Sequence, residues 1–163
     1  MKKLVTLLTA LLAACSVPTA PPAVPQAGSP FPESLPERVE TTPDATSTAT
    51  TIDSYKTDLA HRISQVSSTK VYPGRPQALL RSVVVVRYSI DSGGRLVRSE
   101  ILRSNRDSHT ESAALASLKM AAPFPKPASH LLRNGRVELA ESWLFNNDGR
   151  FQLRSIAQAQ MNE

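Results

Sequence analysis

The sequence lacks an apolar run long enough to cross a membrane, and it has a single cysteine, Cys15, among its 163 residues. The longest apolar stretch is residues 4–14. A helix rises about 1.5 Å per residue, so this stretch covers roughly 16 Å of a hydrocarbon core about 30 Å thick. It is too short to span, and the single cysteine leaves no partner for an internal disulfide.

The residue patterns of common catalytic and metal sites are missing as well. The three histidines, His61, His109 and His130, are scattered without metal-ligand spacing. There is no G-x-S-x-G elbow, and the glycines of "SGGR" join two predicted strands, whereas a phosphate-binding loop would open a helix. Asp91 is interpreted as a turn residue and not as a general base. We therefore predict no enzyme, no cofactor and no metal.

Aromatic residues are scarce, and the prolines are unevenly distributed. Aromatics make up 5% of the chain, and eight of the 13 prolines fall between Cys15 and Thr50. The packed core must therefore come from roughly the last 110 residues, which is small but adequate for one domain. This part is basic, because residues 51–163 have a net charge of +6. A basic surface favours anionic partners such as phospholipid head groups, lipopolysaccharide or acidic peptides.

The start of the chain has the features of a secretory signal: two lysines, a short apolar stretch and small residues at its end. That end, "LAAC" at 12–15, resembles the lipobox of bacterial lipoproteins. The resemblance implies a signal peptide over 1–14 that is cut before Cys15, and a lipid on that cysteine. Several acyl chains would anchor the protein stably. Ser16 implies delivery to the periplasmic side of the outer membrane; an inner-membrane anchor and a signal peptide with a chance cysteine are the alternatives.

Residues 15–50 form a Pro/Ser/Thr-rich segment without helical or alternating periodicity. Such a composition cannot bury enough apolar surface to fold. We predict a disordered spacer here, followed by one folded domain over 51–163.

The first half of the domain is predicted to be a helix and a β-hairpin. Apolar residues three or four apart between Ile52 and Val66 indicate one helical face, with Thr51 or Asp53 as N-cap. "SVVVVRYSI" indicates a strand, "DSGG" at 91–94 a hairpin turn, and "RLVRSEILRS" the return strand. In that return strand Val97 and Ile101 are expected on one face.

The second half is predicted to be a helix and two strands. "SHTE" at 108–111 matches a capping box, and the following helix, with a small apolar face, is stopped by Pro123. "RVELAESWLF" is expected to be a third strand, "NNDG" at 146–149 a turn and "RFQLRSI" a fourth strand. The order α-β-β-α-β-β predicts an α+β domain: a small antiparallel sheet with helices packed on one face.

Several motifs in order resemble the TonB/TolA C-terminal domain family. Tyr72-Pro73 lies ahead of the first strand, and the hairpin has the pattern V-x-V-x-Y-x-I-D-x-x-G-x-[LV]. "AAL" at 113–115 opens the second helix and "PFP" at 123–125 follows it, so the resemblance covers about residues 52–145.

The resemblance implies a periplasmic, non-catalytic domain that binds a short extended peptide of an outer-membrane receptor by strand addition. It implies that the partner strand adds beside residues 136–145 and that Tyr72 and Pro73 lie near the site. The side chains assigned to this partner-strand edge are Val137, Leu139, Glu141, Trp143 and Phe145. Trp143 and Phe145 are also expected to fill the core.

Two features depart from that family. TonB itself has an N-terminal transmembrane helix that couples to an inner-membrane motor, and a lipid tether offers no such helix, which argues against energy transduction in the usual sense. The predicted fourth strand also folds back on the third, where a receptor peptide would pair. Either the site is blocked by its own chain, or another edge binds, or the fourth strand peels away.

Two functions therefore remain open. In the first, the domain is an adaptor that binds a receptor peptide or an envelope protein in TonB-type transport or envelope integrity. In the second, it is a structural envelope module closed by its own fourth strand, with a basic face that contacts anionic components. The candidate anion contacts are Arg95, Arg98, Arg103 and Arg106. Nucleic acid is not expected because the leader directs the chain out of the cytoplasm, and a homodimer through strand exchange stays open.

Overall fold

The computed structural model describes residues 38–160. The signal peptide, Cys15 and most of the predicted spacer lie outside these residues. The helices and strands follow the predicted order. They are α1 (Ile52–Val66), the short 3-10 helix η1 (Ser68–Lys70), β1 (Ser82–Asp91), β2 (Leu96–Arg103), α2 (Ser108–Ala121), the 3-10 helix η2 (Ser129–Leu131), β3 (Arg136–Phe145) and β4 (Phe151–Leu153).

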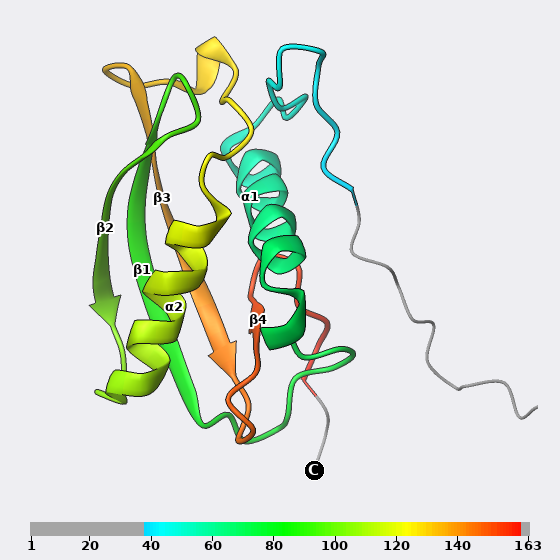
Figure 1. The fold of residues 1–163 in the computed structure, drawn as a ribbon, viewed down its shortest axis with the longest axis vertical. Helices are drawn as coiled ribbons and strands as arrows, with labels where there is room; N and C mark the ends of the chain where they lie inside the picture. The colour runs from blue at the N-terminus through cyan, green and yellow to red at the C-terminus, as the bar shows by residue number, and fades with distance from the viewer. Residues whose placement is uncertain (1–37, 161–163) are drawn as a thin grey trace, which may run out of the picture. The chain divides into compact units, whose positions relative to one another are not determined.

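The strands form one antiparallel sheet in the order β2-β1-β3-β4. Both helices lie on the same face of this sheet, α2 across β1 and α1 beside it toward β4 (Figure 1). The predicted α+β class is confirmed.

The core lies between the sheet and the helices. Alternate residues of β1 are fully buried, and so are alternate residues of β3, because side chains along a strand point to opposite faces. Tyr55, Leu59 and Ile63 of α1 complete the core with Leu118 of α2. The apolar face predicted for α1 is not buried at its two ends, because Ile52 and Val66 are 40% and 39% exposed.

Helix α1 begins where the sequence predicts. Thr51 is the N-cap: its hydroxyl accepts the Ser54 N–H, and the Ser54 hydroxyl accepts the Thr51 N–H, which makes a capping box. Tyr55, one turn later, donates its hydroxyl to the Pro125 carbonyl at 2.7 Å. The start of α1 is thereby fixed to the segment that follows α2.

The cap predicted for α2 is wrong by one residue. Asp107, and not Ser108, is the N-cap, and its carboxylate accepts the N–H groups of His109 and Thr110. A carboxylate accepts two N–H groups here, which a hydroxyl rarely does as well. Glu111 accepts the Ser104 hydroxyl instead of capping the helix.

The predicted face of β2 is wrong for Val97. The pairing of β1 with β2 shifts between Ser89 and Ile90, so that Ile90 lies opposite Leu96 while Ser89 lies opposite Arg98. The extra residue in this β-bulge is Val97, which is 53% exposed, and Leu96 takes its place against the core. Ile101 packs on the core as expected.

The domain begins earlier than position 51. The Ser47 N–H donates to the Lys126 carbonyl and the Lys126 N–H to the Ala45 carbonyl, each at 2.9 Å. Ser47 is buried and Ala49 joins the core. The last part of the predicted disordered spacer is therefore ordered, because residues 45–47 pair with the loop that follows α2.

A buried hydrogen bond connects the sheet to α2. The indole N–H of Trp143 on β3 donates to the Ser117 hydroxyl at 2.9 Å, and that hydroxyl donates to the Ala114 carbonyl. Trp143 and Ser117 are both buried. Since buried polar groups need partners, this bond holds the largest side chain of the core in one orientation.

Replacing Ser117 with alanine leaves the Trp143 indole N–H without its acceptor. We expect the free energy of unfolding, measured by urea denaturation, to fall by about 1–3 kcal/mol. Ser64→Ala is the matched control, because Ser64 is also a buried helical serine but its hydroxyl has no hydrogen-bond partner. Equal losses in the two variants would show that the Trp143 bond contributes nothing.

Candidate functional site: the open edge of strand β3

The fourth strand is shorter than predicted and covers only one end of β3. It comprises three residues, Phe151–Leu153, which pair with Phe145, Leu144 and Trp143. After Leu153 the chain makes one more ladder bond, from the Arg154 N–H to the Ser142 carbonyl, and then turns away. The self-blocking that the sequence suggested is therefore partial.

β4 is itself covered on its outer side. The Tyr72 N–H donates to the Phe151 carbonyl at 2.9 Å, and the Gln152 amide donates to the carbonyls of Tyr72 and Gly74. The Arg150 guanidinium lies 4.8 Å from the centre of the Tyr72 ring. Tyr72 and Pro73 thus flank β4 and not the uncovered part of β3, which corrects the expectation that they lie near a binding edge.

β4 is also part of the core. Phe151 and Leu153 are fully buried, and the Phe151 ring lies 5.5 Å from that of Phe145. Peeling this strand away would expose both side chains to water, at a cost of about 1.5–3 kcal/mol each. An exchange in which β4 gives way to a partner strand is therefore unfavourable.

The remaining part of β3 has a free edge. Ser142 and Asn146 direct backbone groups toward the β4 side, as their bonds with Arg154 and Arg150 show. Because the direction alternates along a strand, Glu138 and Ala140 direct their N–H and C=O groups to this same side. No strand of the described residues pairs with them there, since β4 ends opposite Trp143. These two residues offer two donors and two acceptors.

Both ends of the free edge are closed by the chain itself. At one end, Arg136 exchanges both backbone hydrogen bonds with Arg133 across a tight turn. Asn134 and Gly135 have φ of 51° and 75° there, as a two-residue hairpin turn requires. At the other end, the Ser142 N–H donates to Oε1 of Glu141 at 2.6 Å.

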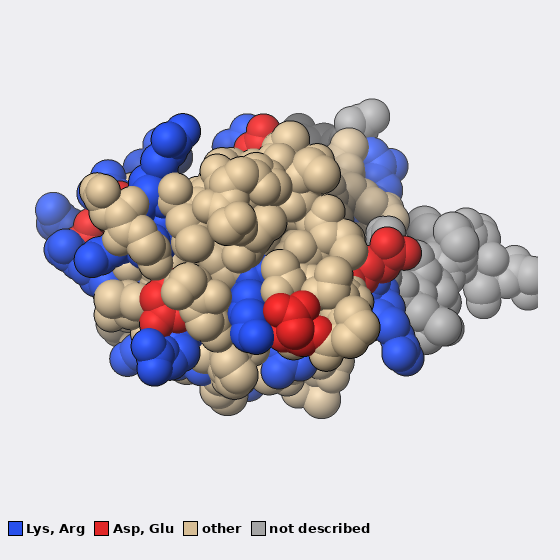
Figure 2. All heavy atoms as spheres, turned by 90° about the horizontal axis from the view of Figure 1, so that it is seen from above, with Lys and Arg blue, Asp and Glu red and all other residues tan. Residues whose placement is uncertain are grey.

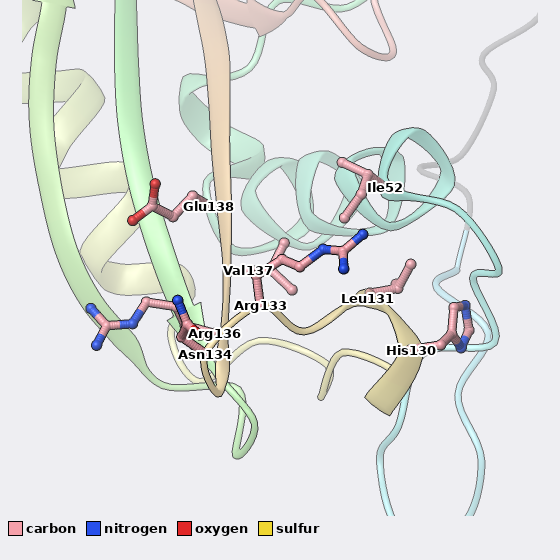
Figure 3. A pocket seen from close by; sticks show the side chains of 8 residues that line it. All are labelled: Ile52, His130, Leu131, Arg133, Asn134, Arg136, Val137 and Glu138. Carbon is pink, nitrogen blue, oxygen red and sulfur yellow. The ribbon is translucent and has the colours of Figure 1, made fainter.

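A hollow of about 620 Å³ lies beside the Arg133–Arg136 turn. Its lining includes Ile52 from the start of α1, Leu131 from η2, and Val137 from β3 (Figure 3). The Arg133 side chain extends over it toward Ile52, while Arg136 and Glu138 lie on the opposite side of β3 (Figure 3). The hollow adjoins the free edge, so the edge and the hollow form one continuous site.

The sequence did not predict this hollow. Its residues are spread over α1, η2, the turn and β3, and no local pattern joins them. The one usable signal was "NG" at 134–135, a strong marker of a tight hairpin turn, which predicts that the chain just before β3 folds back on it.

The side chains that the sequence assigned to the partner-strand edge face inward. Val137, Leu139, Glu141, Trp143 and Phe145 are all buried among the helices and sheet. A partner strand would therefore meet the backbone of β3, and its contacts with these side chains would be limited to their edges.

Glu141 is the unusual member of this set. It is 1% exposed on the core face of β3, and its second carboxylate oxygen has no hydrogen-bond partner among the described residues. The Tyr88 hydroxyl, also buried, lacks a partner as well. Burial raises the pKa of Tyr88 far above its ordinary value, and the charge of Glu141 adds to the rise. The core thus holds two poorly satisfied polar groups close to the free edge.

The opposite edge of the sheet is protected by contrast. β2 carries two irregularities, at Val85/Val86 and Ser89/Ile90 of its pairing with β1. Its exposed face carries Arg98, whose guanidinium lies 2.6 Å from Glu100. Bulges and charges are the means by which natural sheets prevent edge pairing. β3 has no bulge between Val137 and Glu141, although Glu138 is exposed there and Glu141 points inward. The two edges therefore differ in the regularity of their pairing.

The four arginines assigned to anion binding do not form one cluster. Arg95 pairs with Asp91 at 2.8 Å in the hairpin turn, and Arg98 pairs with Glu100. Arg103 and Arg106 lie at the other end of β2, with Arg103 roughly 17 Å from Arg98 and roughly 26 Å from Arg95 along the strand. Seen from above, Lys and Arg side chains lie toward one side of the molecule with Asp and Glu side chains among them (Figure 2).

The three histidines are separate in the structure. His130 lines the hollow, and its Nε2 lies 2.9 Å from the Thr50 carbonyl oxygen; His61 is on α1 and His109 on α2. Within residues 38–160 no three His, Cys, Asp or Glu side chains gather as metal ligands. No helix in the same residues is long and apolar enough to cross a membrane.

Comparisons with known proteins give no family for this chain. No protein-family model, no curated protein and no solved structure matches it.

The alternation along β3 can be measured by amide hydrogen exchange. In the free protein we expect the amides of Glu138 and Ala140 to exchange nearly as fast as in an unfolded chain, because they face an open edge. The amides of Leu139 and Glu141, which face β1, should be strongly protected. NMR-detected exchange tests this, and protection at Glu138 and Ala140 would mean that the edge is covered in solution.

Replacing Glu141 with methionine should stabilise the domain. The change keeps the volume of the side chain and removes a buried carboxylate whose Oε2 lacks a partner among the described residues; it also removes the Oε1 that accepts the Ser142 N–H, and the gain from the first exceeds that loss. We expect the free energy of unfolding in urea to rise by about 1–3 kcal/mol. Glu138→Met, exposed on the same strand, is the control and should stay within about 0.5 kcal/mol. A loss of stability in Glu141→Met would show that the carboxylate is well satisfied.

Proposed function

We propose that this domain binds an extended segment of a partner protein by adding it as a strand to the free edge of β3. The observation that carries this proposal is the outward direction of the backbone N–H and C=O groups of Glu138 and Ala140, beside which residues 38–160 place no strand. An unpaired edge is a template for another strand, and binding domains use it in this way.

The size of the edge indicates a weak and reversible contact. Two residues supply four backbone hydrogen bonds, each worth about 0.5–1.5 kcal/mol net. The hollow beside Val137 adds apolar burial for one side chain of the partner. The sum suits an adaptor that engages and releases its partner, and the two irregularities of β2 disfavour pairing at the opposite edge.

We further propose that the protein acts in the bacterial envelope. "LAAC" at 12–15 supports a lipid on Cys15 and a position on the periplasmic side of the outer membrane. The α-β-β-α-β-β order and the motifs around residues 72–125 support a relation to the TonB/TolA C-terminal domains. The role that fits these features is an adaptor in TonB-type transport or envelope integrity.

A module closed by its own fourth strand is less well supported. β4 pairs with only three residues of β3, and two of the four arginines proposed for an anionic contact are held in ion pairs. We therefore do not propose the structural alternative.

The proposal can be tested at Ala140, whose side chain is exposed and whose N–H faces outward. Ala140→Pro removes that N–H but no bond of the β1 ladder, since proline is tolerated at an edge when its missing donor would face solvent. Ala140→Val keeps the donor and is the matched control. Peptides from a random display library would be selected on the full chain, and their affinities measured for both variants by fluorescence anisotropy.

We expect Ala140→Pro to weaken binding at least tenfold and Ala140→Val to leave it nearly unchanged. In the unsubstituted chain, bound peptide should slow the exchange of the Glu138 and Ala140 amides. Peptides that bind equally well to both variants, or that leave these two amides unprotected, would refute strand addition at β3.

A further inference from the structure

The free edge of β3 has two unlike ends. Near Ser142 it ends at the Glu141 carboxylate and the chain leaving β4. Near Arg136 it ends at a tight turn whose residue Arg133 occupies both backbone groups of Arg136. A strand added along Glu138 and Ala140 therefore cannot continue past Val137 in the sheet. It must end there or leave the sheet.

The place where the added strand must end is the hollow. An added residue opposite Val137 would have its side chain on the same face as Val137, which is the face toward α1, because paired residues in a ladder point the same way. That side chain would meet Ile52 and Leu131, two apolar members of the lining. The residue opposite Leu139 would point the same way. Apolar side chains are thus favoured at these two positions of the ligand.

The charge at this end fixes the direction of the added strand. Of the charged residues that line the hollow, Arg133 lies on the α1 side of β3, while Arg136 and Glu138, which are opposite in charge, lie on the other side (Figure 3). Arg133 extends over it (Figure 3), and no acidic group of residues 38–160 forms an ion pair with Arg133. A strand parallel to β3 would bring its N-terminal side here, and a free ammonium would be repelled. An antiparallel strand would bring its C-terminal side, and a free carboxylate would be attracted.

We infer that the ligand of this edge is the free C-terminus of a partner protein, bound antiparallel to β3, with its carboxylate at Arg133 and its last side chain, an apolar one, in the hollow. Counted from the C-terminus of the ligand, the side chains of the last and third-last residues face α1. The side chains of the second-last and fourth-last residues face the open side of the sheet. The inference rests on the proposed strand addition and adds to it the terminus, the direction and the side-chain pattern.

The test compares two libraries of random ten-residue peptides on the same carrier protein. In one the peptide is joined through its N-terminus, so its C-terminus is free; in the other it is joined through its C-terminus. Both are selected on the full chain. We expect enrichment from the first library, with an apolar residue at the last and third-last positions. An enriched peptide is then synthesised as the free acid and as the C-terminal amide.

We expect the amide to bind at least roughly tenfold more weakly than the acid, since hydrogen bonds to charged groups are worth about that much. Arg133→Gln should weaken the acid by a similar factor and leave the amide unchanged. Arg103→Gln, on the opposite edge strand and with no ion pair to lose, is the matched control and should bind both forms as the unsubstituted chain does.

The outcomes separate the two proposals. If peptides come equally from both libraries and acid and amide bind alike, while the Glu138 and Ala140 amides become protected, strand addition stands and the C-terminal inference is overturned. If the C-terminal amide peptides bind as well as the acids through an internal Asp or Glu, and Arg133→Gln abolishes that binding, the C-terminal inference is overturned and Arg133 recognises an acidic side chain instead. If no selected peptide protects the two amides, the proposed function itself fails and the inference fails with it.

Discussion

The pairing of β1 with β3 over ten residues is the constraint on which the rest of the structure depends. Its register places Val84, Val86, Tyr88 and Ile90 on the same face as the odd-numbered residues of β3, and this face becomes the floor of the core. A shift by one residue would leave one of these two sets on the core face and turn the other to solvent. In this register the backbone N–H and C=O groups of the odd-numbered residues of β3 bond to β1. The corresponding groups of Glu138 and Ala140 therefore point to the opposite side of β3.

The correct predictions of helices and strands rest on local patterns, in which residues close together in the sequence determine the structure. Four consecutive valines from position 83 gave β1, and the apolar spacing in 52–66 gave α1 with its Thr51 cap. The predictions that failed depend on distant contacts. Val97 turns outward because a bulge in the pairing with β1 changes the face of β2, and no pattern within β2 reveals it. Ser47 and Ala49 become ordered because Lys126, far along the chain, pairs with their segment.

The sequence indicated β3 as the candidate binding edge, which stays a prediction, and it indicated that a fourth strand could cover that edge. The structure shows that β4 covers only one end of it. The sequence did not reveal that β4 ends at Leu153, because the residues after it, Arg154 to Ile156, look as suitable for a strand as those before it. The hollow depends on Ile52, Leu131 and Arg133 coming together from three elements, which only the folded chain displays.

The free edge also bears on how such a site changes during evolution. Its hydrogen-bonding groups belong to the backbone at Glu138 and Ala140, and the side chains of both residues point to solvent. For the strand addition proposed above, selection would act on the path of the chain and would tolerate nearly any residue at position 140 except proline. Domains with this arrangement could then keep the edge and the turn that closes it while their sequences diverge. Kinship among such domains is better traced by the geometry of an unpaired strand than by any conserved residue.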